Sequence, residues 1–297
     1  MSQVGIIMST YNGGEYIEEQ IKSIYEQSFR DFTLYVRDDG STDIDFVKKL
    51  QQLQARYGFQ LFLEENIGFL RSFMKLLQET TEELIAFADQ DDIWLENKLL
   101  HGVEWFRYNN KCDVPILFHS AYDYVDNHDN IVGHFYFSNE HYDFRRSITE
   151  NHYSGFSMLI NCKLREMMLQ GDVDGIDYHD WWAAMIVQAF GIGYSDKVVG
   201  ALHRVHGENV TMFNMKTRIK WLKDCFVNES GIHLRAIEFK RCFGELLSAK
   251  DAEMLDIFAF SHYNFIYAIK KCFYLKRWRP MLSSEIMMRL LMLIGKV

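Results

Sequence analysis

Three carboxylates stand within four positions directly after an apolar run of the chain. The run ends at Ala88, and Asp89, Asp91 and Asp92 follow it, with Gln90 between the first two. Carboxylates this close repel one another, and a divalent cation shared with a phosphate of a substrate would offset that repulsion. A solvated acidic turn is the alternative, because short motifs also arise by chance.

The segments that precede this cluster alternate between strand-like and helix-like patterns. In the first helix-like segment, Ile17, Ile21 and Ile24 fall on one face at helical spacing. Strands are predicted over residues 4–10, 32–37, 59–63 and 84–88, and helices over residues 15–27, 45–57 and 70–79. A chain that alternates in this way is expected to form an α/β fold, with a mostly parallel sheet flanked by helices.

Polar residues follow each of the four predicted strands. They are Ser9 to Asn12, Asp38 to Asp43, Asn66 with Gly68, and Asp89 to Asp92. Open parallel sheets bind ligands beyond the carboxyl ends of their strands, so these residues are expected to meet in one site. Ser41 or Asp43 could instead cap the second helix, and Gly13-Gly14 could be a simple turn.

Asp180 is the candidate for a general base. It lies between His179 and Trp181-Trp182 at the start of a predicted helix, and these neighbours would partly desolvate its carboxylate. Desolvation raises the pKa of a carboxyl group toward the range in which it works as a base. The alternative is a helix N-cap with an aromatic core behind it.

The middle of the chain is less regular than its beginning. Strands are predicted over residues 116–119 and 156–160, and the polar, aromatic residues 126–152 between them are expected to form an extended loop or hairpin that faces an acceptor. His206 follows the apolar residues 198–202. It is either a third ligand for a metal or a phosphate, or a structural hydrogen-bonding residue.

A nucleotide diphosphate would find suitable partners at this edge of the sheet. Asp39 and Asp89 can accept hydrogen bonds from a base or a ribose, and Arg71 can neutralise a pyrophosphate. Asp91 is the expected metal ligand. Asp92 is expected either to support that ligand or to cap a helix that starts near residue 94.

Other phosphate-binding motifs are missing from the sequence. GxGxxG and GxxxxGK[ST] are both absent, which disfavours dehydrogenases and P-loop enzymes. A sugar nucleotidyltransferase would need a Gly-rich, basic loop near the N-terminus, and residues 11–15 do not supply one.

From about Val4 to Thr211 the chain resembles the inverting family 2 glycosyltransferases with the GT-A fold. Residues 9–12, 38–43, 66–68 and 89–91 resemble the family's nucleotide-sugar site, residues 179–181 its catalytic-base motif, and residues 206–209 its closing loop. Residues 155–161 and 88–94 are similar to those of the bacterial rhamnosyltransferase-like members.

The resemblance implies a role for each of these residues. It implies that Asp180 deprotonates the acceptor hydroxyl, and that Asp91 and His206 bind Mn²⁺ or Mg²⁺. The residues implied to bind the nucleotide sugar are Thr10, Tyr11, Asn12, Asp39, Asn66, Arg71, Asp89 and Gln90. Those implied to line the acceptor or donor-sugar pocket are Gly155, Asp92, His179, Trp181 and Trp182.

The expected function is the metal-dependent, inverting transfer of a sugar from a UDP- or dTDP-sugar to a hydroxyl of a saccharide or glycoprotein acceptor. The alternative is a non-catalytic, nucleotide-sugar-binding subunit of a glycosylation complex. The presence of both Asp91 and Asp180 disfavours that alternative, because a binding subunit would not need a base.

Length and charge suggest two regions of different kind. The 297 residues are expected to form a catalytic domain over 1–213, with a donor half near 1–110 and an acceptor half near 111–213, followed by a helical region over 214–297. Residues 1–213 hold 17 Lys and Arg against 33 Asp and Glu, whereas residues 214–297 hold 15 against 8. The acidic first region argues against a nucleic acid partner.

Composition also bears on location. The five cysteines are odd in number and never form a CxxC pair, and no apolar run approaches the roughly 20 residues of a membrane span, so a cytoplasmic protein is expected. Residues 270–297 carry seven basic side chains and one acidic one beside many apolar ones. This tail is expected either to lie on the inner face of the cell membrane, or to pack on the catalytic domain, a partner or a second copy.

Overall fold

The computed structural model describes residues 3–205 and 230–297, except positions 110, 127, 138–141 and 261–262. The strands are β1 (Val4–Thr10), β2 (Phe32–Asp39), β3 (Gln60–Glu64), β4 (Leu84–Ala88), β5 (Ile93–Trp94), β6 (Ile116–Val125), β7 (Ile131–Phe135), β8 (Met158–Asn161) and β9 (Ile192–Arg204). The helices are α1 (Ile17–Tyr25), α2 (Ile44–Tyr57), α3 (Phe69–Glu79), α4 (Lys98–Asn109), α5 (Phe144–Thr149), α6 (Cys162–Met168), α7 (His179–Phe190), α9 (Gly231–Phe243), α10 (Ala249–Asp256), α11 (Phe265–Cys272) and α12 (Leu282–Leu293).

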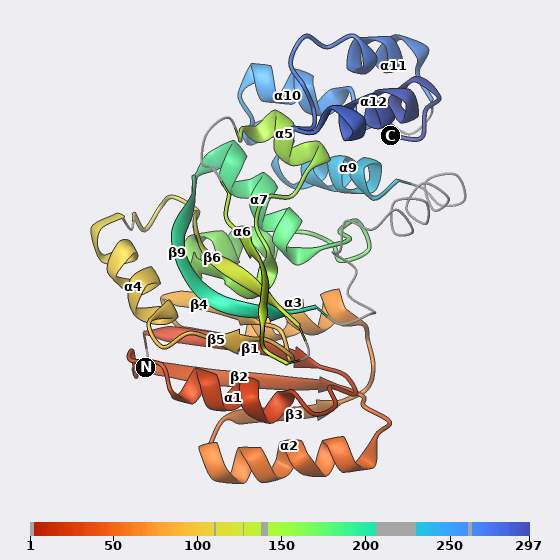
Figure 1. The fold of residues 1–297 in the computed structure, drawn as a ribbon. Helices are drawn as coiled ribbons and strands as arrows, with labels where there is room; N and C mark the ends of the chain where they lie inside the picture. Colours follow the sequence, from red (N-terminus) through yellow and green to blue (C-terminus); the bar gives the residue numbers. More distant parts are fainter. Residues whose placement is uncertain (1–2, 110, 127, 138–141, 206–229, 261–262) are drawn as a thin grey trace.

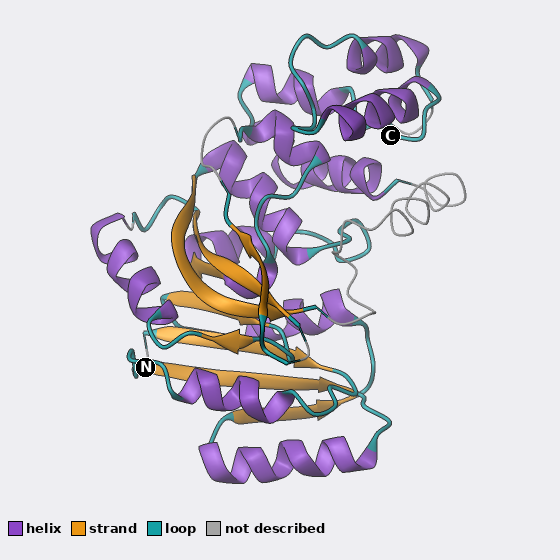
Figure 2. Cartoon of the chain, viewed as in Figure 1, coloured by secondary structure: helices purple, strands orange, loops and turns teal. Residues whose placement is uncertain are grey.

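The strands form one curled sheet between layers of helices (Figures 1 and 2). Their order is β3-β2-β1-β4-β8-β6-β9-β5, and β7 pairs with β6. The first four strands run parallel, as the sequence predicts. β8 then joins β4 and β6 antiparallel, while β6 and β9 run parallel, so the second half of the sheet is mixed.

Alternating side chains of β1 serve two separate cores. Val4, Ile6 and Met8 are buried with residues of α1, α2 and α4, whereas Ile7 is buried on the opposite side with residues of α3 and α7. This alternation follows from the two-residue period of a strand, and burying each such side chain stabilises the fold by roughly 1.5–3 kcal/mol. The sheet is therefore apolar on both faces, and polar chemistry is left to its edge.

The helices after residue 230 continue the second core. Phe239 of α9 packs on Trp182 of α7 with 5.4 Å between the ring centroids, and Met288 of α12 belongs to the same buried cluster. Trp278, which precedes α12, is fully buried, and its carbonyl accepts a hydrogen bond from the Thr149 hydroxyl at 3.3 Å. Part of the tail thus packs on the rest of the chain. The predicted boundary at residue 213 lies outside the described residues.

Two predicted features differ from the structure. The helix expected near Trp94 starts four residues later, at Lys98, because Trp94 is buried in the short strand β5, where it pairs with Ala201 of β9. The strand predicted over 116–119 continues to Val125, because Tyr122 and Val125 are also buried. β6 and β7 form the hairpin expected at the start of residues 126–152.

Candidate functional site

The loops that follow β1 and β2 are joined by Asn12. Its backbone N–H donates to the Ser41 hydroxyl at 2.8 Å, and its side-chain oxygen accepts from the Thr42 N–H at 3.0 Å. Asn12 adopts a φ of 46°, a left-handed conformation that asparagine tolerates better than most residues. Asp43 is the N-cap of α2, as one of the two interpretations of this segment expected, since it accepts from the N–H groups of residues 45 and 46.

Gln90 joins the loop after β1 to the acidic cluster after β4. Its side-chain oxygen accepts a hydrogen bond from the Tyr11 N–H at 3.0 Å. A Cβ on Gly13 would approach that same oxygen to 2.5 Å, so a larger residue there would displace the Gln90 side chain. Tyr11 is 47% exposed as a residue, and a planar group can stack on its ring.

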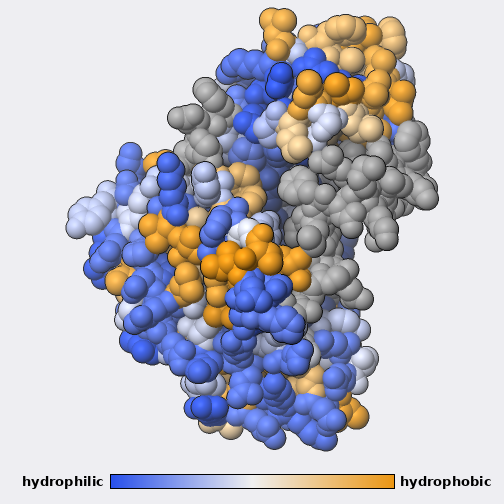
Figure 3. Space-filling view, in the orientation of Figure 1, coloured by the Kyte–Doolittle hydropathy of each residue, from blue (hydrophilic) through white to orange (hydrophobic). Residues whose placement is uncertain are grey.

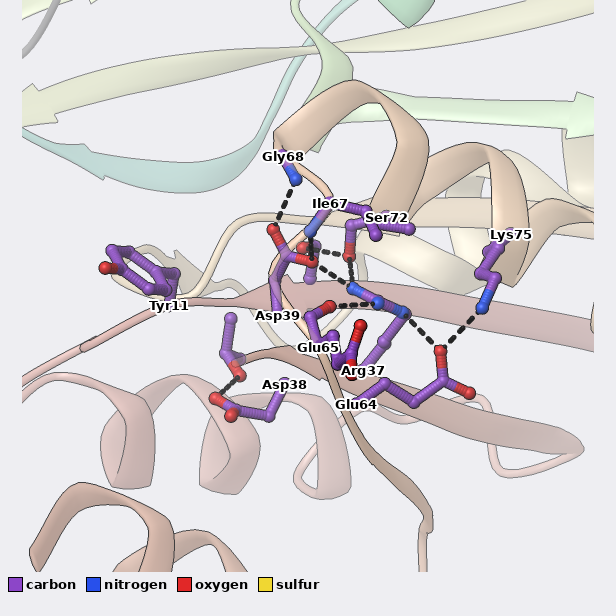
Figure 4. A network of polar contacts seen from close by, with 12 residues as sticks. Tyr11, Arg37, Asp38, Asp39, Glu64, Glu65, Ile67, Gly68, Ser72 and Lys75 are labelled. Carbon is purple, nitrogen blue, oxygen red and sulfur yellow. Dashed lines mark hydrogen bonds and ion pairs between the residues drawn. The ribbon is translucent and has the colours of Figure 1, made fainter. Parts of the chain in front are cut away.

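Asp39 fixes the loop between β3 and α3 (Figure 4). Its carboxylate accepts hydrogen bonds from the N–H groups of Ile67 at 2.9 Å and Gly68 at 2.8 Å, and it pairs with the guanidinium of Arg37. Asp39 is only 3% exposed. The neighbouring Gly40 lies against the backbone of Asn66, which is exposed. The structure therefore gives Asp39 a supporting role, and its contact with a nucleoside stays a prediction.

The buried pair of Asp39 and Arg37 leads to a prediction about stability. Replacing Asp39 with Ala is expected to lower the free energy of unfolding by about 3 kcal/mol, because it leaves the buried Arg37 guanidinium without its closest partner. Urea denaturation followed by circular dichroism measures the loss. Asp45→Ala removes a carboxylate from an exposed pair with Lys48 and should leave the midpoint unchanged. Equal midpoints for both variants would contradict the stabilising role of the buried pair of Asp39 and Arg37.

The three carboxylates after β4 lie in different surroundings. Asp92 is fully buried, and its Oδ1 lies 2.8 Å from Nδ1 of His203 on β9. Its Oδ2 has no hydrogen-bond partner within the described chain. Burial raises the pKa of Asp89 well above its usual range, and the charges of Asp92 and Asp91 raise it further. Such a cluster is stabilised by an added positive charge.

Two basic residues stand next to this cluster that the sequence did not single out. Lys98 is buried in the first turn of α4 and donates to the carbonyl of Phe156 at 2.9 Å; burial lowers its pKa to about 7. Burial also opposes protonation of His203, but its hydrogen bond to Asp92 and the charge of that residue raise its pKa overall. The His203 ring is stacked on Phe156 at 4.6 Å. In the sequence, the position of Lys98 next to Leu99 and Leu100 was the one sign that this lysine is buried.

Asp180 lies in the first turn of α7, near the end of β4. Burial raises its pKa to about 6, although hydrogen bonds from the N–H groups of Trp181 and Gly155 act in the opposite direction. The predicted raised pKa is confirmed. The N-cap of α7 is Tyr178, so the interpretation of Asp180 as a helix cap is wrong. The charge of Asp180 also makes a smaller contribution to the raised pKa of Asp89, so the two carboxylates lie close enough to interact electrostatically.

The side chains of His179 and Trp182 are buried behind this site and do not face it, contrary to the prediction. The His179 ring is stacked on Phe87 at 5.0 Å and 7°, and it is almost fully buried, which lowers its pKa to about 3. A Cβ on Gly155 would lie 2.6 Å from its Nε2, so only glycine fits there. Trp182 has no exposed surface. The resemblance implied that both side chains line a pocket, but the helix turns them toward the core.

The remaining predicted residues occupy less informative positions. Thr10 is buried and donates to the Asp38 carboxylate at 3.1 Å. Arg71 projects from α3 and pairs with Asp174. Trp181 is half-buried and donates its indole N–H to the Ser147 carbonyl at 2.6 Å. The His206 motif lies outside the described residues.

The described part of the chain holds no group of three or more His, Cys, Asp or Glu side chains already arranged around a metal. The acidic cluster nevertheless fits a divalent cation, because Asp89 and Asp92 have raised pKa values and the Asp92 Oδ2 atom is unsatisfied. Oxygen atoms of a bound diphosphate would have to supply further ligands. Asp91 is half-buried in this cluster.

A curled α/β sheet with acidic strand ends and a buried carboxylate nearby is the arrangement expected of a GT-A glycosyltransferase fold. Residues 5–168 match the family described as "Glycosyl transferase family 2". The match covers more than half of the chain, which therefore belongs to this family.

Two curated relatives show where the sequence similarity is concentrated. The "dTDP-rhamnosyl transferase RfbG" of Shigella flexneri is 34% identical over 110 residues, which is 35% of this chain and 38% of that protein. The "UDP-Glc:alpha-D-GlcNAc-diphosphoundecaprenol beta-1,3-glucosyltransferase WfgD" of Escherichia coli is 33% identical over 132 residues, 44% of this chain and 50% of that protein. The chain thus covers half or less of the length of these relatives.

A solved structure extends the likeness in fold to nearly the whole chain. The crystal structure of S. aureus TarS 1-349 superposes with a TM-score of 0.62, at 16% identity, over 99% of this chain and 81% of that one. At this identity the likeness concerns the fold alone.

Among the described helices, none combines the length and the apolar character needed to cross a membrane.

Proposed function

We propose that this chain transfers a sugar from a nucleotide-diphosphate sugar to a hydroxyl of a saccharide acceptor, with a divalent metal and with inversion at the anomeric carbon. The observation that carries the proposal is the presence, within one site, of a carboxylate of raised pKa and an acidic cluster at the end of a parallel strand. The relatives named above act on dTDP- and UDP-sugars by their names, which supports the same donor class here.

The donor would lie across the linked loops after the first four strands. Tyr11 would stack on the base with its exposed ring, Asp89 would accept from the ribose, and Arg71 would neutralise a phosphate after leaving Asp174. Asn12 and Gln90 hold these loops in place through the hydrogen bonds described above. Residues 1–110 would thus form the donor half and residues 111–213 the acceptor half.

Asp91 would hold Mn²⁺ or Mg²⁺ at the end of β4, with Asp92 orienting it and His206 as a further ligand. The metal would stabilise the negative charge of the departing diphosphate. Burial raises the pKa of Asp92, and His203 and Lys98 act in the opposite direction, which favours the charged form that binds cations. The loop between β4 and β5 is fixed at both ends by strand pairing, which limits the movement of the side chains of residues 89–92.

Asp180 would act as the base on the acceptor side. Its carboxylate would take the proton of the acceptor hydroxyl while the hydroxyl oxygen forms a bond to the anomeric carbon and the bond from that carbon to the diphosphate oxygen breaks. One displacement of this kind inverts the configuration. The Gly155 N–H and the Trp181 N–H orient the carboxylate.

The raised pKa of Asp180 gives a pH dependence. Only the deprotonated carboxylate can accept a proton, so kcat/KM is expected to fall about tenfold for each pH unit below 6 and to level off above it. The charged side chains that interact with Asp180 are Asp177 on the preceding loop and Asp89 after β4. A transfer assay between pH 5 and pH 8 measures the profile. A base of ordinary pKa would give a flat profile over this range, which would contradict the assignment.

A panel of UDP-, dTDP- and GDP-sugars tests the donor class directly. Thermal stabilisation and slow hydrolysis of one donor, both dependent on Mn²⁺, are expected. A protein that only binds nucleotide sugars, as a subunit of a glycosylation complex would, should be stabilised by the donor without hydrolysing it.

A further inference from the structure

The surface formed by residues 263–297 is unusually apolar. Hydrophobic side chains gather at the end of the molecule built from α11 and α12 (Figure 3). The exposed large hydrophobic residues in this region are Tyr263, Phe265, Ile266, Phe273, Leu275, Met281, Leu282, Ile286, Met287, Leu290 and Ile294. Contiguous exposed apolar surface of this extent marks an interaction site in most proteins that fold in water.

The outer side of α12 and its continuation carry a regular stripe. Leu282, Ile286, Leu290 and Ile294 follow one another at four-residue spacing, and each is between 54% and 59% exposed. The opposite side of the helix already faces the core, where Met288, Leu291 and Met292 are buried. Packing of the core therefore accounts for one apolar side of α12 but not for the other.

α11 and the connection to α12 add to the same surface. α11 packs beside α12. Phe265 and Ile266 are exposed at the beginning of α11, and Phe273 and Leu275 are exposed after its end, with Leu275 fully so. Aromatic and aliphatic side chains that project from a short helical hairpin can enter the boundary between lipid headgroups and acyl chains.

The exposed charged side chains within residues 263–297 have one sign. Lys270, Lys276 and Arg277 are exposed beside the apolar residues. The only carboxylate side chain in residues 263–297 belongs to Glu285, which is buried and accepts from Arg289 Nε at 2.6 Å. The surface thus presents cations without anions, although the chain as a whole has a formal charge of −9.

We propose that the face of α11 and α12 binds the surface of an anionic lipid bilayer, with the α12 stripe inserted among the headgroups and the lysine and arginine side chains on the lipid phosphates. A second copy of the chain fits less well, because it would bring cations against cations. The proposal goes beyond sugar transfer and does not depend on it.

Flotation of the full chain with vesicles tests the proposal. Strong binding is expected to vesicles of phosphatidylglycerol and phosphatidylethanolamine, and weak binding to vesicles of phosphatidylcholine alone. The variant Ile286→Glu/Leu290→Glu should bind the anionic vesicles at least about tenfold more weakly, because both exposed side chains would then resist insertion. Tyr108→Glu is the matched control, since Tyr108 is 89% exposed on α4, and it should bind like the unchanged protein.

A charge variant separates the two contributions. Lys276→Glu/Arg277→Glu should lose the preference for anionic over neutral vesicles while keeping the same circular dichroism spectrum and thermal midpoint. Failure of the unchanged chain to float with anionic vesicles, or equal flotation of Ile286→Glu/Leu290→Glu, would overturn the proposal. So would sedimentation velocity that shows a dimer dissociated by Ile286→Glu without any binding to lipid. Donor hydrolysis in solution needs no bilayer, so it reports on the proposed sugar transfer separately.

Discussion

Replacing Asp180 with Asn is expected to lower kcat by about a thousandfold while leaving the affinity for the donor nearly unchanged. The amide has almost the same shape as the carboxylate, but it cannot accept the proton of the acceptor hydroxyl. The backbone N–H groups of Gly155 and Trp181 can still donate to its side-chain oxygen, so the fold of the site should survive. A transfer assay gives kcat, and isothermal titration of the nucleotide sugar gives the affinity.

Asp45→Asn is the control for this experiment, because it makes the same chemical change at an exposed position of α2. It should leave both quantities unchanged. An Asp180→Asn variant that retains a tenth or more of the activity would show that another group takes the proton. A loss of donor affinity equal to the loss of kcat would instead place Asp180 in the donor site.

Replacing Asp91 with Ala is expected to weaken Mn²⁺-dependent donor binding by about a hundredfold or more. The reason is that the diphosphate would lose the cation that offsets its charge next to Asp89 and Asp92. The enthalpy of donor binding with and without Mn²⁺ measures the effect. Thermal stability without metal should not fall, and it is expected to rise slightly, because removing one carboxylate relieves repulsion in the cluster.

Glu96→Ala removes a carboxylate a few residues further along the chain, at an exposed position, and should leave metal-dependent binding intact. Undiminished titration of the donor with Mn²⁺ by the Asp91→Ala variant would refute the metal role of Asp91. It would leave the proton-accepting role of Asp180 standing, because that assignment rests on separate contacts.

The parallel half of the fold could be predicted because its signals are local. β1 and β4 have the bounds expected from their apolar runs, and α2 ends at the predicted residue because Gly58 takes a left-handed conformation there. The strand over residues 156–160 was predicted, but its antiparallel pairing with β4 could not be foreseen, since pairing between residues 84–86 and 159–161 depends on contacts far apart in sequence. β5 could not be predicted for a different reason: its two residues are too few to show the alternation of a strand.

The candidate site was predictable in its acidic residues but not in its supporting ones. The carboxylates after β4 follow a strand directly, so their location could be inferred from the topology. The partner of Asp92 is His203, which lies 111 positions away in the chain, and nothing local in the sequence announces that contact. His179 shows the opposite error: the resemblance implied that it lines a pocket, whereas its ring is buried against Phe87.

Because α7 and the C-terminal helices share one core, we expect residues 230–297 to be needed for the rest of the chain to fold. Trp182 follows Asp180 by two positions, and Phe239 of α9 covers its ring. A fragment that ends before α9 would therefore leave a tryptophan and several aliphatic side chains of α7 open to water. Loss of activity in such a fragment would report a collapsed support for the base, and it would say nothing about membranes or partners.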